Sequence, residues 1–239
     1  MLGYYNYTVI LTYMSLISAV FGIFAGLTGE GHPFIATTCL MLCGLFDAFD
    51  GMIARTRKKS TEDEKHFGIQ IDSLTDLLAF GVLPCSICYA IYMSHLDIHR
   101  KSNILNILKP FGALKTYIYM IVFCLFVLAA LIRLAYFNVS ETKRQKETSA
   151  KRKEYTGLPV TSAAIIFPTV SLIQFVYGRR VDISPIYLVT MLLTGFLFLS
   201  KIKIGKPGLK EILIMVAIGA VEFLFIVFFA RAYLTGHAV

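Results

Sequence analysis

The sequence predicts an all-α, polytopic membrane protein, and two observations support this fold class. The chain has 239 residues, of which 56% are hydrophobic and only 16% are charged, whereas soluble globular chains carry about 25% charged residues. Its apolar runs are also long enough to cross a hydrocarbon core of about 30 Å as helices. A large soluble helical protein needs charged residues every few positions along each helix, and these runs lack them.

Seven apolar runs are the predicted transmembrane helices. The first is of full span length and has no basic segment before it, so we do not expect a cleaved secretory leader. Glu222 in the last run is expected either to pair across helices or to lie at the membrane interface. The predicted spans lie near residues 8–28, 33–55, 69–93, 116–138, 158–178, 184–200 and 211–234.

Basic residues are concentrated in three of the connectors between these spans. Most of the 23 Lys and Arg residues lie in the connectors at 55–68, 139–157 and 200–210. Cytoplasmic loops carry such an excess, so we expect these connectors and the N-terminus to be cytoplasmic. We also expect the protein to reside in the plasma membrane. Loops near anionic lipid headgroups account for the net charge of +8, and no nucleic-acid partner is expected.

Four aspartates are the candidate functional residues. Asp47 and Asp50 lie three positions apart at the end of the second run, and Asp72 and Asp76 lie four apart near the start of the third. Residues at these spacings share one face of a helix. Because a short connector joins the two antiparallel helices, their acidic faces are predicted to meet at the cytoplasmic edge of the membrane. A lone aspartate at a helix end is usually a cap or a solvated charge, but acids inside a membrane are costly and by default functional.

These acidic faces predict a metal site. Four adjacent carboxylates repel one another, and one or two bound divalent cations remove the conflict. Such oxygen ligands suit Mg²⁺, Mn²⁺ or Ca²⁺ rather than Zn²⁺. The same faces carry Gly51, Ala54 and Gly68, which lack bulk where a ligand approaches the backbone. Arg55 can offer a planar fork of donors to a phosphate, so the set as a whole is typical of a polyphosphate site.

The spacing of these residues resembles the signature of the CDP-alcohol phosphatidyltransferase family, D-x2-D-G-x2-A-R followed by G-x3-D-x3-D. The first half of the signature lies at Asp47–Arg55 and the second at Gly68–Asp76, and the gap between them is longer than in the family pattern, which lengthens a cytoplasmic loop. Four further stretches resemble those of the membrane-embedded phosphatidylserine synthases of this family. They are IDSLTDLLAFGVLP (71–84), IRLAYFNV (132–139), GLPVTSA (157–163) and LSKIKIGKP (199–207).

The resemblance implies a reaction in which L-serine attacks CDP-diacylglycerol and releases CMP. It also implies a six-helix transferase domain over residues 1–207, an accessory span over 208–239, and a homodimer in contact with membrane lipids. Asp76 is implied as the general base. The resemblance further implies that two ions of Mg²⁺ or Mn²⁺ bind at this site, or that Ca²⁺ does. The implied metal ligands are Asp47, Asp50, Asp72 and Asp76. The implied residues of the CDP pocket are Asp47, Gly51, Ala54, Arg55 and Gly68.

The acceptor alcohol is less constrained than the metal site. Arg133 is the only Lys or Arg well inside an apolar run, and we expect it, with Asn138, to bind the serine carboxylate or the lipid phosphate. Alternatively, Arg133 extends to the interface or pairs with an aspartate. Glycerol 3-phosphate, an inositol phosphate, or serine with an archaeal-type lipid are alternative substrates. A cation transporter is the alternative of another class, although a cation path gains nothing from Arg55.

Overall fold

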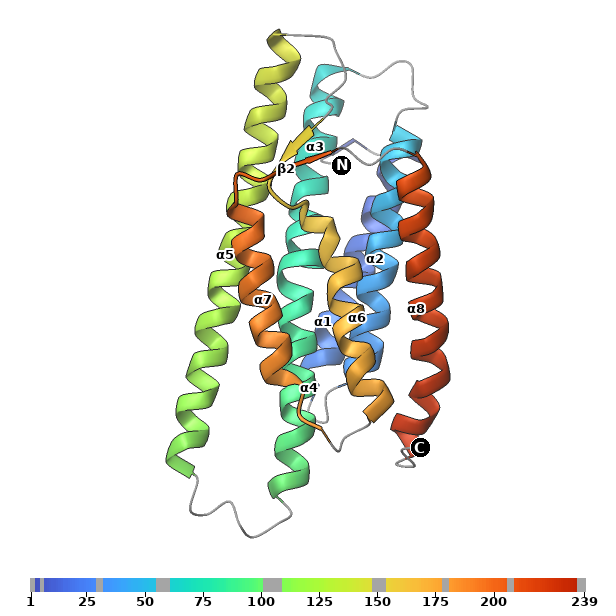
Figure 1. Cartoon of the computed structure of the whole chain (residues 1–239). Coiled ribbons are helices and arrows are strands. Elements are labelled where there is room, and N and C mark those ends of the chain that lie inside the picture. Colours follow the sequence, from blue (N-terminus) through green and yellow to red (C-terminus); the bar gives the residue numbers. More distant parts are fainter. Residues whose placement is uncertain are drawn as a thin grey trace.

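The computed structural model describes residues 3–4, 7–28, 32–54, 61–100, 109–147, 154–177, 181–205 and 209–235. Helices run side by side between the two ends of a bundle (Figure 1). The main helices are α1 (Ile10–Leu27), α2 (Pro33–Ala54), α3 (Glu62–Asp76), α4 (Leu83–Arg100), α5 (Lys109–Glu147), α6 (Ala163–Tyr177), α7 (Ser184–Leu199) and α8 (Leu209–Thr235). The short elements are η1 (Tyr7–Val9), the π-helical η2 (Leu77–Val82), η4 (Val160–Ser162), β1 (Glu154–Thr156) and β2 (Lys203–Gly205).

These helices confirm the predicted fold class, a polytopic bundle of membrane helices. Each of the seven predicted spans corresponds to a helix or to a continuous series of helices. The third span corresponds to α3, η2 and α4, which follow one another without a break. Five segments of the described chain are long and apolar enough to cross a membrane, and the apolar stretches of α7 and α8 are shorter. Large apolar side chains such as Phe196 and Phe228 are more than 70% exposed on the outside of the bundle, as expected for surface that faces lipid.

Two helices extend into segments that we predicted as cytoplasmic loops. α3 begins at Glu62, because Thr61 and Glu64 form a capping box in which each side chain accepts a hydrogen bond from the other's backbone N–H. Part of the lengthened gap in the signature is therefore helix. α5 continues to Glu147, and an ion pair between Arg144 and Glu141, one turn apart, supports this extension.

Small residues let the helices at the N-terminal side of the bundle pack closely. A Cβ atom on Gly22 of α1 would lie 2.6 Å from the Cβ of Cys39 in α2. A Cβ on Gly44 of α2 would lie 2.4 Å from that of Ala164 in α6. Helices in membranes associate through such small residues, so α1 packs closely on the first half of α2, and α6 packs closely on α2 one turn before Asp47.

α8 packs on the outside of α6 and α2 (Figure 1). Thr169 of α6 donates a hydrogen bond to Glu222 of α8, and Glu222 is only 7% exposed. Glu222 thus pairs across helices, which is the first of the two expectations for it.

β1 and β2 form a two-stranded antiparallel ribbon that we did not predict, with Tyr155 opposite Ile204. The ribbon joins the segment before α6 to the segment after α7, at the end of the bundle where α3 begins (Figure 1). Gly157, directly after β1, has φ +79°, and its N–H donates to the carbonyl of Ile202 (2.7 Å). Only glycine adopts this conformation without strain.

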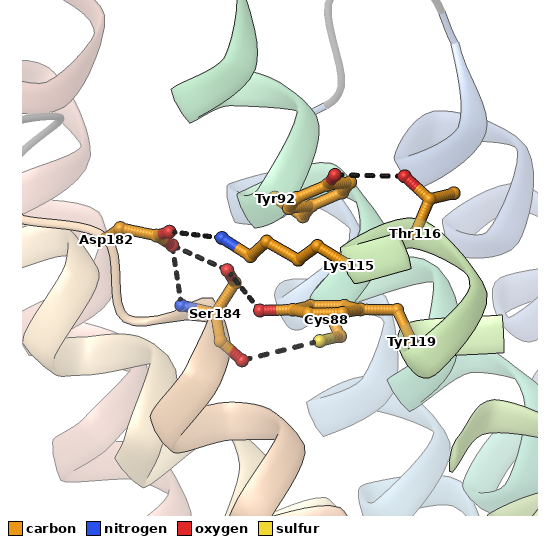
Figure 2. Close-up of polar contacts among 7 residues, drawn as sticks. All are labelled: Cys88, Tyr92, Lys115, Thr116, Tyr119, Asp182 and Ser184. Atoms are coloured by element: carbon orange, nitrogen blue, oxygen red, sulfur yellow. Dashed lines mark hydrogen bonds and ion pairs between the residues drawn. The ribbon is translucent and has the colours of Figure 1, made fainter. Parts of the chain in front are cut away.

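A polar network ties α4, α5 and α7 together at the opposite end of the bundle (Figure 2). Lys115 Nζ lies 3.1 Å from Asp182 Oδ2, and Asp182 Oδ1 accepts from the backbone N–H of Ser184 (3.0 Å). Tyr119 Oη and Ser184 Oγ share a hydrogen bond of 2.8 Å. Lys115 also lies over the rings of Tyr92 and Tyr119, 5.0 and 5.6 Å from their centroids. Each charge in this network therefore has an opposite charge or an aromatic face beside it.

Candidate active site

Three of the four predicted metal ligands converge between the last turns of α2 and the second half of α3. One carboxylate oxygen from each of Asp47, Asp50 and Asp72 lies within 4.8 Å of the other two. α2 and α3 run in opposite directions (Figure 1), and the distances between the three carboxylates confirm that the acidic faces meet at these residues. They lie at the end of the bundle that the charge distribution predicts to be cytoplasmic.

Asp76 lies one turn further along α3, deeper in the bundle. It is 9% exposed, and it shares a face of α3 with Asp72, four residues earlier. Asp76 is thus a buried acid next to the cluster of three, rather than a fourth member at the same depth. A carboxylate in this position can accept a proton from a substrate held at the cluster.

A π-helical segment, η2, follows Asp76 directly. The wider turns of η2 pack against α5, where a Cβ on Gly81 would lie 3.3 Å from the Cβ of Ala130. Short π segments occur frequently at functional sites, and this one offsets the rotation of α4 relative to the acidic face of α3. We did not predict it, because hydropathy periodicity does not distinguish an inserted residue inside a long apolar helix.

Residues of the predicted CDP pocket are only partly described. Gly51 and Ala54 belong to the last turns of α2, and Arg55 lies outside the described residues. Gly68 lies on α3 one turn before Asp72, and among the described residues no neighbouring atom comes within 4 Å of the place where its Cβ would be. The face of α3 beside the acids is therefore open at Gly68, which suits close approach of a ligand.

Arg133 on α5 is buried, with 5% of its surface exposed. Its Nε donates to the carbonyl of Leu158 (3.1 Å), its Nη2 donates to that of Gly157 (3.5 Å), and its guanidinium lies 5.6 Å from the centre of the Phe137 ring. A Cβ on Gly157 would come within 2.8 Å of the Ser200 carbonyl oxygen. Arg133 therefore holds the turn at Gly157, and its burial excludes the alternative in which it extends to the membrane surface.

Two further side chains contact the acidic helices. Asn138 of α5 donates to Ser73 Oγ (2.7 Å), directly beside Asp72 in α3. Thr12 of α1 donates to Asp50 Oδ2 (3.5 Å). We predicted a site role for Asn138 but none for Thr12, because a single hydroxyl inside an apolar run gives no signal in the sequence.

The donor set fits a divalent cation with hard oxygen ligands. Three carboxylates within 4.8 Å of one another can converge on Mg²⁺, Mn²⁺ or Ca²⁺, which bind oxygen at roughly 2.0–2.6 Å. No His or Cys belongs to this cluster among the described residues, so the site does not have the ligands that Zn²⁺ prefers.

The fold and the site together define a class of protein, the integral membrane proteins with a cluster of carboxylates at one end of a helical bundle. The chain belongs to the CDP-alcohol phosphatidyltransferase family, whose model matches residues 5–235. The match includes both halves of the acidic signature and extends through α8.

The chain is also similar in sequence to individual proteins of known name. The chain is 30% identical over 196 residues to the CDP-diacylglycerol–serine O-phosphatidyltransferase of Saccharomyces cerevisiae, which covers 76% of this chain and 62% of the relative. It is 28% identical over 185 residues to the protein of the same name from Helicobacter pylori, covering 77% and 65%. It is 31% identical over 146 residues to the archaetidylserine synthase of Methanothermobacter thermautotrophicus, covering 61% and 50%. The chain thus spans less than two thirds of the length of these three relatives.

Proposed function

We propose that this protein transfers the phosphatidyl group of CDP-diacylglycerol to L-serine, giving phosphatidylserine and CMP. The observation that carries the proposal is the convergence of Asp47, Asp50 and Asp72 within 4.8 Å in a chain of the CDP-alcohol phosphatidyltransferase family. The names of the S. cerevisiae and H. pylori relatives support serine as the acceptor.

The acids have two proposed roles. Two ions of Mg²⁺ or Mn²⁺ would be held by the four carboxylates of Asp47, Asp50, Asp72 and Asp76. Bound metal would neutralise the diphosphate and stabilise CMP as a leaving group. Asp76 accepts the proton of the serine hydroxyl while the serine oxygen forms a bond to the lipid-side phosphorus and the bond from that phosphorus to CMP breaks. Because an ordinary carboxylate is a weak base for an alcohol, proton transfer is concerted with attack.

The proposed CDP pocket lies beside these acids. It comprises Asp47, Gly51, Ala54, Arg55 and Gly68. The open face at Gly68 supports this assignment, because the diphosphate must approach the backbone of α3 there. The acyl chains of the substrate would extend into the bilayer alongside the apolar outer surface of the bundle.

Arg133 and Asn138 are the proposed acceptor-binding residues. Arg133 brings a buried positive charge to the acidic end of the bundle, and the serine carboxylate needs such a partner. Asn138 is linked through Ser73 to the helix that carries Asp72. Both residues come from the same half of α5, so the acceptor would be held between α5 and the acidic face of α3.

The cellular setting is part of the proposal. We infer a homodimer in the plasma membrane with its acidic end at the cytoplasmic face. The excess of Lys and Arg in the connectors at that end supports the orientation. A soluble nucleotide product and a soluble amino acid are then released and bound on the same side of the membrane.

A second candidate substrate is an archaeal-type CDP-linked lipid with serine as the acceptor. The 31% identity to an archaetidylserine synthase favours it. The chemistry at the acids is unchanged, because both substrates carry the same CDP group and differ in the lipid part.

The proposal is tested with the purified full chain in detergent, CDP-diacylglycerol and Mn²⁺ or Mg²⁺. CMP release is measured with L-serine, glycerol 3-phosphate or inositol phosphate as acceptor, and then with an archaeal-type CDP-lipid and serine. We expect release that depends on serine. Release with glycerol 3-phosphate or inositol phosphate but not serine would contradict the acceptor assignment. An absence of CMP with every combination would contradict the enzyme and favour cation transport.

A further inference from the structure

One face of α1 carries three hydroxyl side chains at intervals of three residues, Thr12, Ser15 and Ser18, and this face packs on α2. Thr12 Oγ1 lies 3.5 Å from Asp50 Oδ2, and Ser18 Oγ donates to the carbonyl of Cys39 (3.1 Å). The Sγ of Cys43 donates to the carbonyl of Ser15 (3.3 Å). The two helices therefore run antiparallel in register, and Thr12 is the member of this face that lies level with the acidic cluster.

Thr12 makes a hydrogen bond that is unusual for a hydroxyl in a membrane helix. Ser and Thr in helices usually donate to the carbonyl one turn earlier in the same helix. Thr38, Ser94 and Thr190 do this in α2, α4 and α7. Thr12 is 5% exposed and instead donates across to α2, to a carboxylate of the site.

We propose that Thr12 is a positioning residue for Asp50. A hydrogen bond to Oδ2 restricts rotation of the Asp50 carboxylate and holds it toward Asp47 and Asp72. Partners of this kind orient metal ligands, and their removal typically lowers metal affinity or activity about 10- to 100-fold. At 3.5 Å the bond is long, so an effect near the lower limit is expected. The inference rests on the proposed metal site.

The test measures binding of Mn²⁺ alone to the full chain in detergent by isothermal titration calorimetry. Thr12→Val keeps the shape of the side chain and removes the donor, whereas Thr12→Ser keeps the hydroxyl. Ser18→Ala is the matched control, because it removes a hydroxyl from the same face of α1 whose partner is a backbone carbonyl. We expect the Kd for Mn²⁺ to rise about tenfold in Thr12→Val and to stay near the unaltered value in Thr12→Ser and Ser18→Ala.

The outcomes separate this inference from the proposed function. If the unaltered chain binds Mn²⁺ and Thr12→Val binds it equally well, the role of Thr12 is wrong and the metal site stands. If Thr12→Val and Ser18→Ala weaken binding equally, packing of α1 on α2 explains the effect and the inference is also wrong. If the unaltered chain does not bind Mn²⁺, the metal site and the inference both fall.

Discussion

The aspartate side chains at the two ends of the bundle have opposite electrostatic surroundings. At one end Asp182 is compensated, because Lys115 lies 3.1 Å away and Ser184 donates to its other oxygen (Figure 2). At the other end three carboxylates lie within 4.8 Å of one another. In the described part of the chain, no Lys or Arg forms an ion pair with Asp47 or Asp72.

This difference distinguishes an acid that stabilises the fold from acids that need a ligand. A half-buried Asp with a Lys and a backbone donor is satisfied within the protein. Like charges held close together repel one another, and a bound cation or proton relieves that repulsion. The acidic end is therefore the part of the bundle where we propose the functional site, and the network at the opposite end joins α4, α5 and α7.

The largest expected effect comes from making the same substitution at both ends. Asp76→Asn removes the proposed base and should lower CMP release by about 10²- to 10⁴-fold while leaving binding of CDP-diacylglycerol largely intact. Asp182→Asn is the matched control and should retain activity close to that of the unaltered chain. Near-normal turnover in Asp76→Asn, measured as CMP release at saturating serine, would show that another group takes the proton.

Arg133 allows a second comparison of charges at the two ends. It is a buried cation at the acidic end, and its guanidinium donates hydrogen bonds to backbone carbonyls. Arg133→Gln should raise the KM for L-serine about 10- to 100-fold, since a hydrogen bond to a charged group contributes about 1.5–3 kcal/mol. The KM for CDP-diacylglycerol should change little.

Gly157→Ala is the control for the Arg133 variant, because it strains the turn that Arg133 holds and keeps the charge. An equal rise of the serine KM in both variants would mean that the turn, and not the guanidinium, sets serine affinity.

A smaller effect is expected on the pH dependence of stability. Burial alone would raise the pKa of Asp182, but hydrogen bonds from Ser184 and Lys115 outweigh it and hold the pKa below its usual value. The ionised group therefore stabilises the folded chain at neutral pH, and this contribution is lost as pH falls through the lowered pKa. Asp182→Asn should lower Tm by a few degrees at pH 7, and the difference should shrink below about pH 4. A difference that is constant from pH 7 to pH 3 would contradict this role of the charge.

Much of the fold follows from local features of the sequence. Each apolar run became a helix, because a backbone in lipid must satisfy its hydrogen bonds within the segment. The meeting of Asp47, Asp50 and Asp72 was predictable from helical spacing and a short connector. The start of α3 was not predicted, although Thr61 and Glu64 have the spacing of a capping box that marks it.

Other features depend on contacts between residues that are distant in sequence. Lys115 and Asp182 are separated by 67 positions, and neither carries a motif that indicates the other. The β1–β2 ribbon pairs two strands of three residues each, and α6 and α7 lie between these strands in the sequence. The bond from Thr12 to Asp50 requires the register of α1 on α2, which close packing at residues such as Gly22 determines. Tertiary packing sets these features, and hydropathy patterns do not encode it.

The central claim is that the carboxylates at one end of the bundle bind a divalent cation, and thermal unfolding with EDTA or Mn²⁺ tests it most directly. Mn²⁺ at 100 times its Kd should stabilise the unaltered chain and Asp182→Asn by about 2.7 kcal/mol, and Asp47→Asn much less. In EDTA, Asp47→Asn should unfold at or above the Tm of the unaltered chain, because one of the mutually repelling charges is gone. A Tm that Mn²⁺ does not raise in the unaltered chain, or raises equally in Asp47→Asn, would contradict the account.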